Sequence, residues 1–301
     1  MARSTKTFDR WKAHEASTWA MQVLLKYDSQ LMGLWGTNIS SAAFTYHHLG
    51  KNGADWLDKP GSHFKAGVHV ESYFANLREW SDAYNLFSNW VNLSVVLTLA
   101  ANLETYIASV VRVAIESDPG LLLGAPRSVD GALLHKHDRP WVVEIAEHLE
   151  SCTRGDWSAR FGALRRIFGR VPDTLLALHG DLEEVRRARN RFGHAFGRDI
   201  EEARRTGTLD TLPMESMKRS RVERLRTSII KGAKELDRFL LDAHIGEFEA
   251  VLFYANLFPR LNQQVTAGQR AAYLKKAIGD HGAVPRGKQH CKGLVEYWEA
   301  L

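Results

Sequence analysis

The chain has 301 residues, of which 45% are hydrophobic and 25% are charged. These values are those of an ordinary soluble globular protein, and they exclude a disordered, collagen-like or low-complexity chain. The length is about twice that of a usual single domain and too short for three full domains. The formal net charge of +5 is compatible with an anionic partner but does not by itself establish one.

Helical periodicity appears along almost the whole chain, whereas the alternation and tight-turn signals of β-strands are scarce. Only eight prolines interrupt the sequence, so long helices are possible. We therefore predict an all-α protein. The expected helices, in chain order, are Ser17–Tyr27, Val68–Trp90, Asn92–Ser117, Trp141–Glu150, Asp156–Phe168, Pro172–Phe192, Lys218–Ala243, Glu247–Phe258, Ala267–Ile278 and Lys288–Ala300.

Glycine and proline cluster in the segments between these helices, where they favour turns and loops. The expected loops are Gly50–Gly61, Asp118–Pro140, Gly197–Pro213 and Gly279–Gly287. We group the elements into three consecutive parts. Residues 1–64 are an N-terminal extension, residues 65–245 a helical bundle, and residues 246–301 a C-terminal helical segment. Both flanks are short for independent domains, so we expect them to pack on the bundle.

The sequence carries no sign of export or of a thiolate metal site. Its two cysteines, Cys152 and Cys291, form no Cys-x-x-Cys pair, and such low cysteine usage fits a reducing compartment. Residues 1–8 run into charged sequence without the apolar core of a signal peptide. The most apolar stretch, Val91–Ile115, contains four polar interruptions, which make it too polar for a bilayer span of ~20 apolar residues. They are Asn92, Asn102, Glu104 and Arg112. We expect a cytoplasmic protein with no membrane partner.

The basic excess is local. Between Ser151 and Leu240 there are 20 Lys and Arg against 13 Asp and Glu, a net charge of +7, which leaves −2 for the rest of the chain. The excess consists mostly of arginine, whose planar fork matches the geometry of a phosphate group. These arginines could simply form a solvated helix face. Because they are concentrated around one predicted helix, phosphate binding is about as good an interpretation.

That helix lies within Pro172–Phe196, and its apolar stripe is interrupted at Arg189. The stripe consists of Leu175, Leu178, Leu182, Val185, Phe192 and Phe196. Such a stripe faces the core or a partner helix, where an unpaired guanidinium costs several kcal/mol. The alternatives are a satisfied core arginine, or a side chain that extends past its apolar neighbours to reach water.

Polar side chains surround Arg189. Asn190 and His194 are four residues apart, so they share a helical face, and histidine can transfer a proton near neutral pH. Arg189 and His194 are five apart, about 140° around an ideal helix, and do not point the same way. Two antiparallel copies crossing at a dimer interface could bring both pairs into one cleft. Gly193 and Gly197 could also end or bend the helix and re-aim His194.

The string Arg189-Asn190-x-x-x-His194 resembles the R-x4-6-H signature of the HEPN superfamily, in which the arginine is commonly followed by a polar residue. An earlier predicted helix carries Leu103-Glu104, which looks like the acidic position of many HEPN first helices. The resemblance covers roughly residues 72–243. It implies a four- or five-helix HEPN-like bundle that forms a homodimer through the motif helices.

The resemblance also implies a metal-independent endoribonuclease with no cofactor. Arg189 would hold the scissile phosphate, His194 would act as general acid or base, and Asn190 would orient His194 or the phosphate. Attack by the RNA 2′-OH would leave a 2′,3′-cyclic phosphate. Family members of this type are often toxins, abortive-infection or anti-phage proteins, which implies an antitoxin or activating protein as a possible partner. Neighbouring arginines are our candidates for RNA contact, and Glu104 is a candidate supporting acid. These arginines are Arg186, Arg187, Arg191 and Arg198.

Other interpretations stay open. A HEPN-like bundle could bind RNA, a nucleotide or a protein without cleavage, and a purely structural helical protein could bury one arginine. The string His135-Lys-His137-Asp138 lacks the remaining spacing of a metal site and is better explained as an exposed polar loop. Four aromatic residues recur at helical spacing, which is typical of core or interface packing more than of a base-stacking platform. They are Trp80, Tyr84, Phe87 and Trp90.

Overall fold

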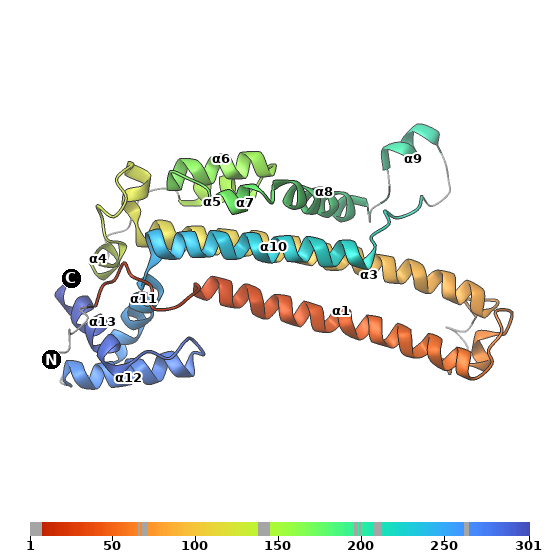
Figure 1. Ribbon diagram of the computed structural model, residues 1–301, viewed down its shortest axis with the longest axis horizontal. Helices are drawn as coiled ribbons and strands as arrows, with labels where there is room; N and C mark the ends of the chain where they lie inside the picture. The colour runs from red at the N-terminus through yellow and green to blue at the C-terminus, as the bar shows by residue number, and fades with distance from the viewer. Residues whose placement is uncertain are drawn as a thin grey trace. The chain divides into compact units, whose positions relative to one another are not determined.

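In the computed structural model, all regular secondary structure in the described part of the chain is helical. The described residues are 8–65, 67, 72–137, 145–195, 198, 200–207, 212–261 and 265–301. They form twelve α-helices, a few short 3-10 segments and one π-helical turn, Leu241–Ile245, with no strand among them (Figure 1). The all-α prediction is confirmed for these residues.

The chain divides into two compact units, each built from segments that are distant in sequence. The first unit contains Met1–Leu24, Leu103–Gly180 and Ile230–Leu301, and the second contains Leu25–Asn102 and Asp181–Ile229. The helices that contribute residues to both are α1 (Trp19–Lys51), α3 (Leu77–Ser117), α8 (His179–Ala195) and α10 (Arg219–Leu240). All three of the consecutive parts expected from sequence supply residues to the first unit.

Two helices of the first unit begin at residues whose side chains cap them. Asp156 accepts a hydrogen bond from the backbone N–H of Ala159 at 2.8 Å, and Thr266 forms a capping box with Gln269. Such caps satisfy N–H groups that have no partner inside the helix. The other helices of this unit are α4 (Gly131–Lys136), α5 (Ile145–Thr153), α6 (Trp157–Phe168), α7 (Asp173–Leu176), α11 (Phe248–Leu257), α12 (Ala267–Asp280) and α13 (Lys288–Ala300).

The N-terminal segment is held in this unit by a buried arginine. The guanidinium of Arg10 donates to Asp130 at 2.7 Å and to the Ser117 carbonyl at 2.6 Å. Gly246 follows the π-helical turn and has φ +56°. The N-terminal segment packs against it so closely that a Cβ atom at position 246 would lie 2.3 Å from the Arg10 carbonyl oxygen. Glycine is therefore required at position 246 both by its backbone conformation and by the close approach.

A second buried ion cluster lies beside the first. Arg286 is 3% exposed and contacts Glu15 at 2.7 Å and Glu247 at 3.0 Å. Glu247 also accepts from His290 Nε2 at 2.9 Å and from the backbone N–H of His14 at 2.7 Å. Hydrogen bonds from several elements thus compensate the cost of burying these charges.

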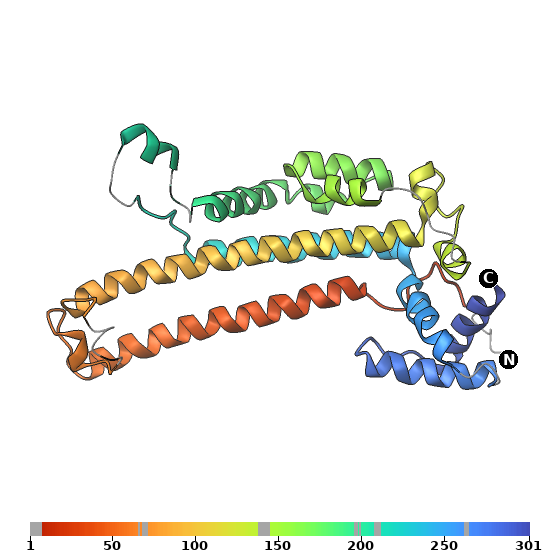
Figure 2. The same cartoon turned by 180° about the vertical axis from the view of Figure 1, so that it is seen from behind.

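The second unit is built on a long helical hairpin. Helix α1 (Trp19–Lys51) and the first part of α3 run antiparallel and side by side in both ribbon views (Figures 1 and 2). Trp35 Nε1 donates to Asn92 Oδ1 at 2.9 Å, and eleven residues farther along α1 the Tyr46 hydroxyl lies 2.9 Å from that of Ser81. The pairs lie eleven residues apart on each helix, so the register is constant. The unit also contains α8 (His179–Ala195), α9 (Ile200–Thr206) and the first turns of α10.

Two asparagines of α3 hold the segment that leads into α10. Asn89 donates to the Glu215 carbonyl at 2.8 Å and accepts from the backbone N–H of Met217 at 2.7 Å. Asn92 donates to the Met217 carbonyl at 2.8 Å. Met217 itself is 1% exposed, so this short segment is ordered by side-chain amides in place of a regular backbone ladder.

We expect Asn89→Leu to lower the free energy of unfolding by about 2 kcal/mol, because it leaves a buried backbone N–H and a carbonyl without partners. Urea denaturation followed by circular dichroism measures the change. The matched control is Asn85→Leu, an exposed asparagine one turn away on the same helix, which should change the stability by less than about 0.5 kcal/mol. Equal losses for the two variants would contradict the role assigned to Asn89.

Several helix boundaries differ from those predicted. Helix α1 continues to Lys51, far beyond the predicted end at Tyr27, and α3 is continuous where a break was expected near Val91. Glycine, serine and threonine weaken the helical signal in the second half of α1. Hydroxyl groups there bond to carbonyls one turn back, as from Thr45 to Ser41 at 2.8 Å, so the polar groups are satisfied inside the helix.

Among the described residues, α3 is the one helix long and apolar enough to cross a membrane by length and composition. Its most apolar window has a mean hydropathy of 1.5, and half of that window is buried within the protein. A core helix of a soluble protein has the same composition, so this helix alone is weak evidence for a membrane location.

Candidate nucleic-acid interface on helix α8

The motif residues lie on α8, whose buried face follows a different path from the one predicted. Leu182, Val185, Ala188 and Phe192 are buried, whereas Arg189 is partly exposed. The spacings of three, three and four residues keep one face toward the core without position 189. The expectation that Arg189 replaces a core residue was therefore wrong, because Ala188 occupies that place. The predicted helix Pro172–Phe192 is divided, since α7 ends at Leu176 before α8 begins.

Arg189 and Asn190 are joined in the structure. Arg189 Nη1 donates to Asn190 Oδ1 at 3.1 Å, and both side chains are partly exposed. His194 belongs to the same helix, which continues through Gly193 to Ala195, but its side chain lies outside the described residues, as do Phe196 and Gly197. A continuous helix separates positions 189 and 194 by about 140°. One copy of α8 does not direct these two positions to the same side.

The arginines predicted to contact RNA have protein partners. Arg186 contacts Glu183 at 2.5 Å, and Arg187 approaches the same carboxylate at 3.3 Å. Arg191 forms two bonds to Glu215, at 2.8 and 2.9 Å. Arg198 donates to the Leu212 carbonyl at 3.0 Å. Arg187 and Arg191, with side chains 65% and 51% exposed, are the two best placed to exchange a carboxylate for a phosphate.

Acidic residues of α8 also bind the arginines of α10. Arg221 contacts Glu184 at 2.5 Å, and Arg224 contacts the same residue at 2.7 Å as well as Asp181. Burial alone would raise the pKa of Glu184, but hydrogen bonds from Arg224 and Arg221 outweigh it and hold the pKa below its usual value. Glu215 follows the same pattern through Arg191 and Arg221. These carboxylates therefore stay ionised at neutral pH and neutralise much of the local arginine charge.

Sequence reasoning counted the arginines and missed this acidic network. The pairing of Glu183 with Arg186 could have been found from the three-residue spacing on one helix face. The pairing of Glu184 with Arg221 could not, because 37 residues separate them in sequence. The net charge of +7 between Ser151 and Leu240 is therefore what remains after many ion pairs have formed. Less positive charge is available to a partner than the number of arginines indicates.

Glu104, the candidate supporting acid, already has a cationic partner. It accepts from Arg160 Nη2 at 3.0 Å, and the Arg160 side chain is only 5% exposed. Arg160 also donates to the Gly155 carbonyl at 3.2 Å, which fixes the start of α6. The pair belongs to the first unit and is explained by the packing of α3 against α6.

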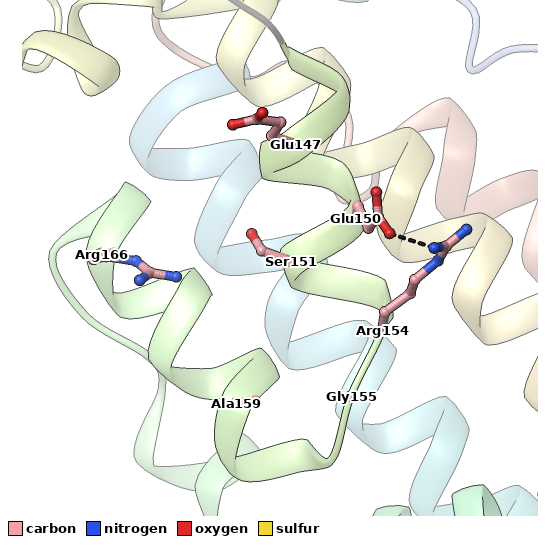
Figure 3. Close-up of a pocket in the computed structure, with 7 residues that line it drawn as sticks. All are labelled: Glu147, Glu150, Ser151, Arg154, Gly155, Ala159 and Arg166. Atoms are coloured by element: carbon pink, nitrogen blue, oxygen red, sulfur yellow. Dashed lines mark hydrogen bonds and ion pairs between the residues drawn. The ribbon is translucent and has the colours of Figure 1, made fainter.

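A separate hollow lies between α5 and α6 in the first unit (Figure 3). It encloses about 440 Å³. Arg154 reaches back to Glu150 across its rim, as the dashed line shows, while Glu147 and Arg166 lie on the two helices. Charges of both signs line an open surface, so the hollow has no marked preference for an anion or a cation.

The described residues contain no group of three or more His, Cys, Asp or Glu side chains placed to hold a metal ion. The string predicted as a polar loop is partly helical, because His135 and Lys136 belong to α4. His137 Nε2 lies 3.1 Å from the Leu301 carbonyl oxygen, and Asp138 is outside the described residues. Comparisons with protein families, with curated proteins and with solved structures find no significant match to this chain. The HEPN resemblance therefore depends on the motif residues and their helical context.

Proposed function

We propose that the chain is a metal-independent endoribonuclease of the HEPN type, acting as a homodimer on RNA in the cytoplasm. The observation that supports this most is the paired Arg189 and Asn190 on a continuous helix that also carries His194. The all-helical character of the described residues agrees with the bundle that the resemblance implies. Toxin activity or anti-phage defence, restrained by an antitoxin or released by an activating protein, is the corresponding biological role.

The proposed chemistry needs no group beyond these side chains. The RNA 2′-OH attacks the adjacent phosphorus while His194 removes its proton, and the P–O5′ bond breaks as the protonated His194 returns that proton to the departing 5′ oxygen. The products are a 2′,3′-cyclic phosphate and a 5′-OH end. Arg189 neutralises the charge that develops on the phosphate oxygens. Asn190 holds the Arg189 guanidinium in position through its amide oxygen.

The angle between positions 189 and 194 makes a second copy part of this proposal. On one helix the two positions lie about 140° apart. An antiparallel crossing of two α8 helices would place Arg189 of one copy beside His194 of the other, and a two-fold axis would create this pairing twice. Arg187 and Arg191, the most exposed arginines of the cluster, would then contact the flanking RNA phosphates.

We expect the purified protein to cleave RNA in the presence of EDTA and to leave cyclic-phosphate ends. Arg189→Ala and His194→Ala should each lower the cleavage rate by about 100-fold, the loss typical of removing one electrostatic or proton-transferring group. Gel analysis of end-labelled RNA measures the rates, and acid hydrolysis of the cyclic ends identifies the product.

Arg165→Ala is the matched control, because Arg165 is an exposed arginine of the same basic segment on α6, away from the motif. It should leave cleavage unchanged. If the wild type does not cut RNA in EDTA, or if the two motif variants cut as fast as the control, the enzymatic proposal is wrong. Growth arrest on expression that disappears with His194→Ala would support the toxin role.

A HEPN-like bundle that binds without cleaving is the second candidate, favoured by the ion pairs that occupy the arginines of α8. In that case the wild type and the Arg189→Ala variant differ in RNA or nucleotide affinity and neither cleaves. Filter binding across a salt series distinguishes the two candidates, since phosphate contacts make affinity fall steeply with salt.

A further inference from the structure

The hairpin of α1 and α3 carries almost no charge along two facing stretches. No Asp, Glu, Lys or Arg occurs between Ser29 and Gly50, nor between Ala83 and Asn102. The constant register set by the Trp35–Asn92 and Tyr46–Ser81 contacts places the two stretches opposite each other. Exposed helix surfaces of soluble proteins normally carry charges, and depletion of charge with retention of aromatic residues is the mark of an interface core.

A projecting aromatic pair stands on this surface. Phe87 and Trp90 are 46% and 40% exposed, and their rings stack with centroids 6.2 Å apart at an interplanar angle of 17°. We call these two residues the aromatic pair.

A small groove lies on the same hairpin. It encloses about 240 Å³, less than the ~300 Å³ at which ordinary ligand sites begin, so it suits a protein side chain better than a free ligand. Leu34 on its wall is 67% exposed. The lining residues are Tyr27, Gln30, Leu31, Leu34, Thr98 and Asn102, which include no charged side chain and two amides able to accept from an indole N–H.

The groove and the aromatic pair lie on one face of α3. Phe87 and Thr98 are eleven residues apart, which is about three helical turns and ~16 Å. The opposite face of α3 carries Asn89 and Asn92, which bind the segment before α10. Midway along the free face stands Ser94, whose hydroxyl donates to the Trp90 carbonyl at 2.9 Å and is therefore satisfied within its own helix.

We infer that this face binds a second copy of the chain, with two α3 helices crossing antiparallel near Ser94. A two-fold axis at that point sets the aromatic pair of each copy over the groove of the other, because both features lie equally far from the axis. Trp90 Nε1 then donates to the amide oxygen of Gln30 or Asn102 in the partner copy. The inference concerns a surface other than α8 and stands independently of the proposed ribonuclease activity.

The chemistry of the face favours protein over RNA or lipid. A nucleic acid requires Lys or Arg near its phosphates, and the two stretches have none. A bilayer disfavours the amides of Gln30 and Asn102, whereas a protein interface accommodates them as hydrogen-bonding groups. The absence of charge also removes like-charge repulsion between identical copies.

The size of the face sets the expected strength. From Tyr27 to Phe44 the hairpin is ~26 Å long, and its two helices together are ~20 Å wide. That gives roughly 500 Å² per copy before interdigitation, against about 800 Å² in a standard interface. We therefore expect a reversible dimer with a dissociation constant in the micromolar range.

Sedimentation of the full chain across a micromolar concentration series tests the inference. Trp90→Lys and Thr98→Glu should each weaken self-association by about 30-fold or more, the loss typical of a central aromatic anchor or of its pocket. Trp90 of one copy opposes Thr98 of the other. Mixing the two variants should therefore restore the association that each lost, because the ammonium introduced in one chain then lies beside the carboxylate introduced in its partner.

Asn85→Lys, on the other side of α3 from Trp90, is the control and should associate like the wild type. Circular dichroism and the melting temperature should be unchanged in all variants, since the substituted side chains are exposed or lie at the groove wall. A wild type that remains monomeric overturns the inference, as does a variant mixture that associates no better than either variant alone. Because the proposed α8 pairing does not involve Trp90 or Thr98, self-association that both variants leave unchanged also overturns it. Monomeric wild type that instead binds neutral phosphatidylcholine vesicles, with binding lost in Trp90→Lys, would assign the face to a membrane and equally overturn it.

Discussion

Replacing Arg286 by alanine is expected to lower the free energy of unfolding by about 3–5 kcal/mol, the cost of leaving buried charges without their partner. The side chains of Arg286, Glu15 and Glu247 are 3%, 4% and 1% exposed, so water cannot replace the guanidinium. The two carboxylates would then face each other across an empty space. Urea denaturation at neutral pH measures the loss.

The same substitution should loosen the N-terminal segment. Glu15 belongs to that segment, and Glu247 holds the backbone N–H of His14 at 2.7 Å. Limited proteolysis of the variant should therefore cut before Trp19 sooner than in the wild type. Arg112→Ala removes an exposed i,i+4 pair with Glu116 and is the control, with an expected loss below about 0.5 kcal/mol. Equal losses in both variants would contradict the assignment of a buried cluster.

Glu249→Gln is expected to stabilise the protein at alkaline pH. Burial raises the pKa of Glu249 from 4.5 to about 7, and the nearby Asp237 and Glu15 add to the effect. Glu249 accepts from the backbone N–H of Trp19 at 2.9 Å, a bond that the glutamine amide oxygen can also accept. The variant thus keeps the acceptor and removes the cost of the buried charge.

The direction follows from proton linkage. Between pH 4.5 and about 7 the unfolded chain has lost a proton that the folded protein still holds at Glu249, so stability falls as pH rises and then levels off. The variant should gain up to about 3 kcal/mol over the wild type at pH 8 and nothing at pH 4. Urea denaturation at pH 4, 6 and 8 measures the difference.

Glu296→Gln provides the control for this titration, because its side chain is 55% exposed and pairs with Lys292 on the surface of α13. Its effect should be small and nearly independent of pH. A gain for Glu249→Gln that is the same at pH 4 and pH 8 would show that packing, and not the buried ionisation, separates the variant from the wild type.

Local signals predicted most helices of the first unit, although the predicted loop Asp118–Pro140 contains α4 and a 3-10 segment, Pro119–Leu123. The predicted helix Lys288–Ala300 has the bounds of α13, and Asp156 and Thr266 cap α6 and α12 where their residue types favour a helix start. Capping and apolar periodicity depend on residues within one or two turns of each other. For this reason they can be read without knowledge of the tertiary structure.

The second unit was harder to predict because its helices depend on packing. The second half of α1 is rich in glycine and hydroxyl residues, so its intrinsic helix preference is weak, and contacts such as Trp35 with Asn92 stabilise it. The aromatic residues at helical spacing were assigned to core or interface packing. Trp80 and Tyr84 do stack on each other, while Phe87 and Trp90 stack on each other but remain 46% and 40% exposed.

The sequence by itself determined the all-helical character of the described chain, the position of the Arg189-Asn190 pair on a helix, and the local excess of arginine, because each depends on residues close together in the chain. Tertiary structure decided that Ala188 faces the core in place of Arg189, and that carboxylates such as Glu184 occupy the arginines. These outcomes depend on which helices meet. Ion pairs between residues 37 or more positions apart exist only after the chain has folded.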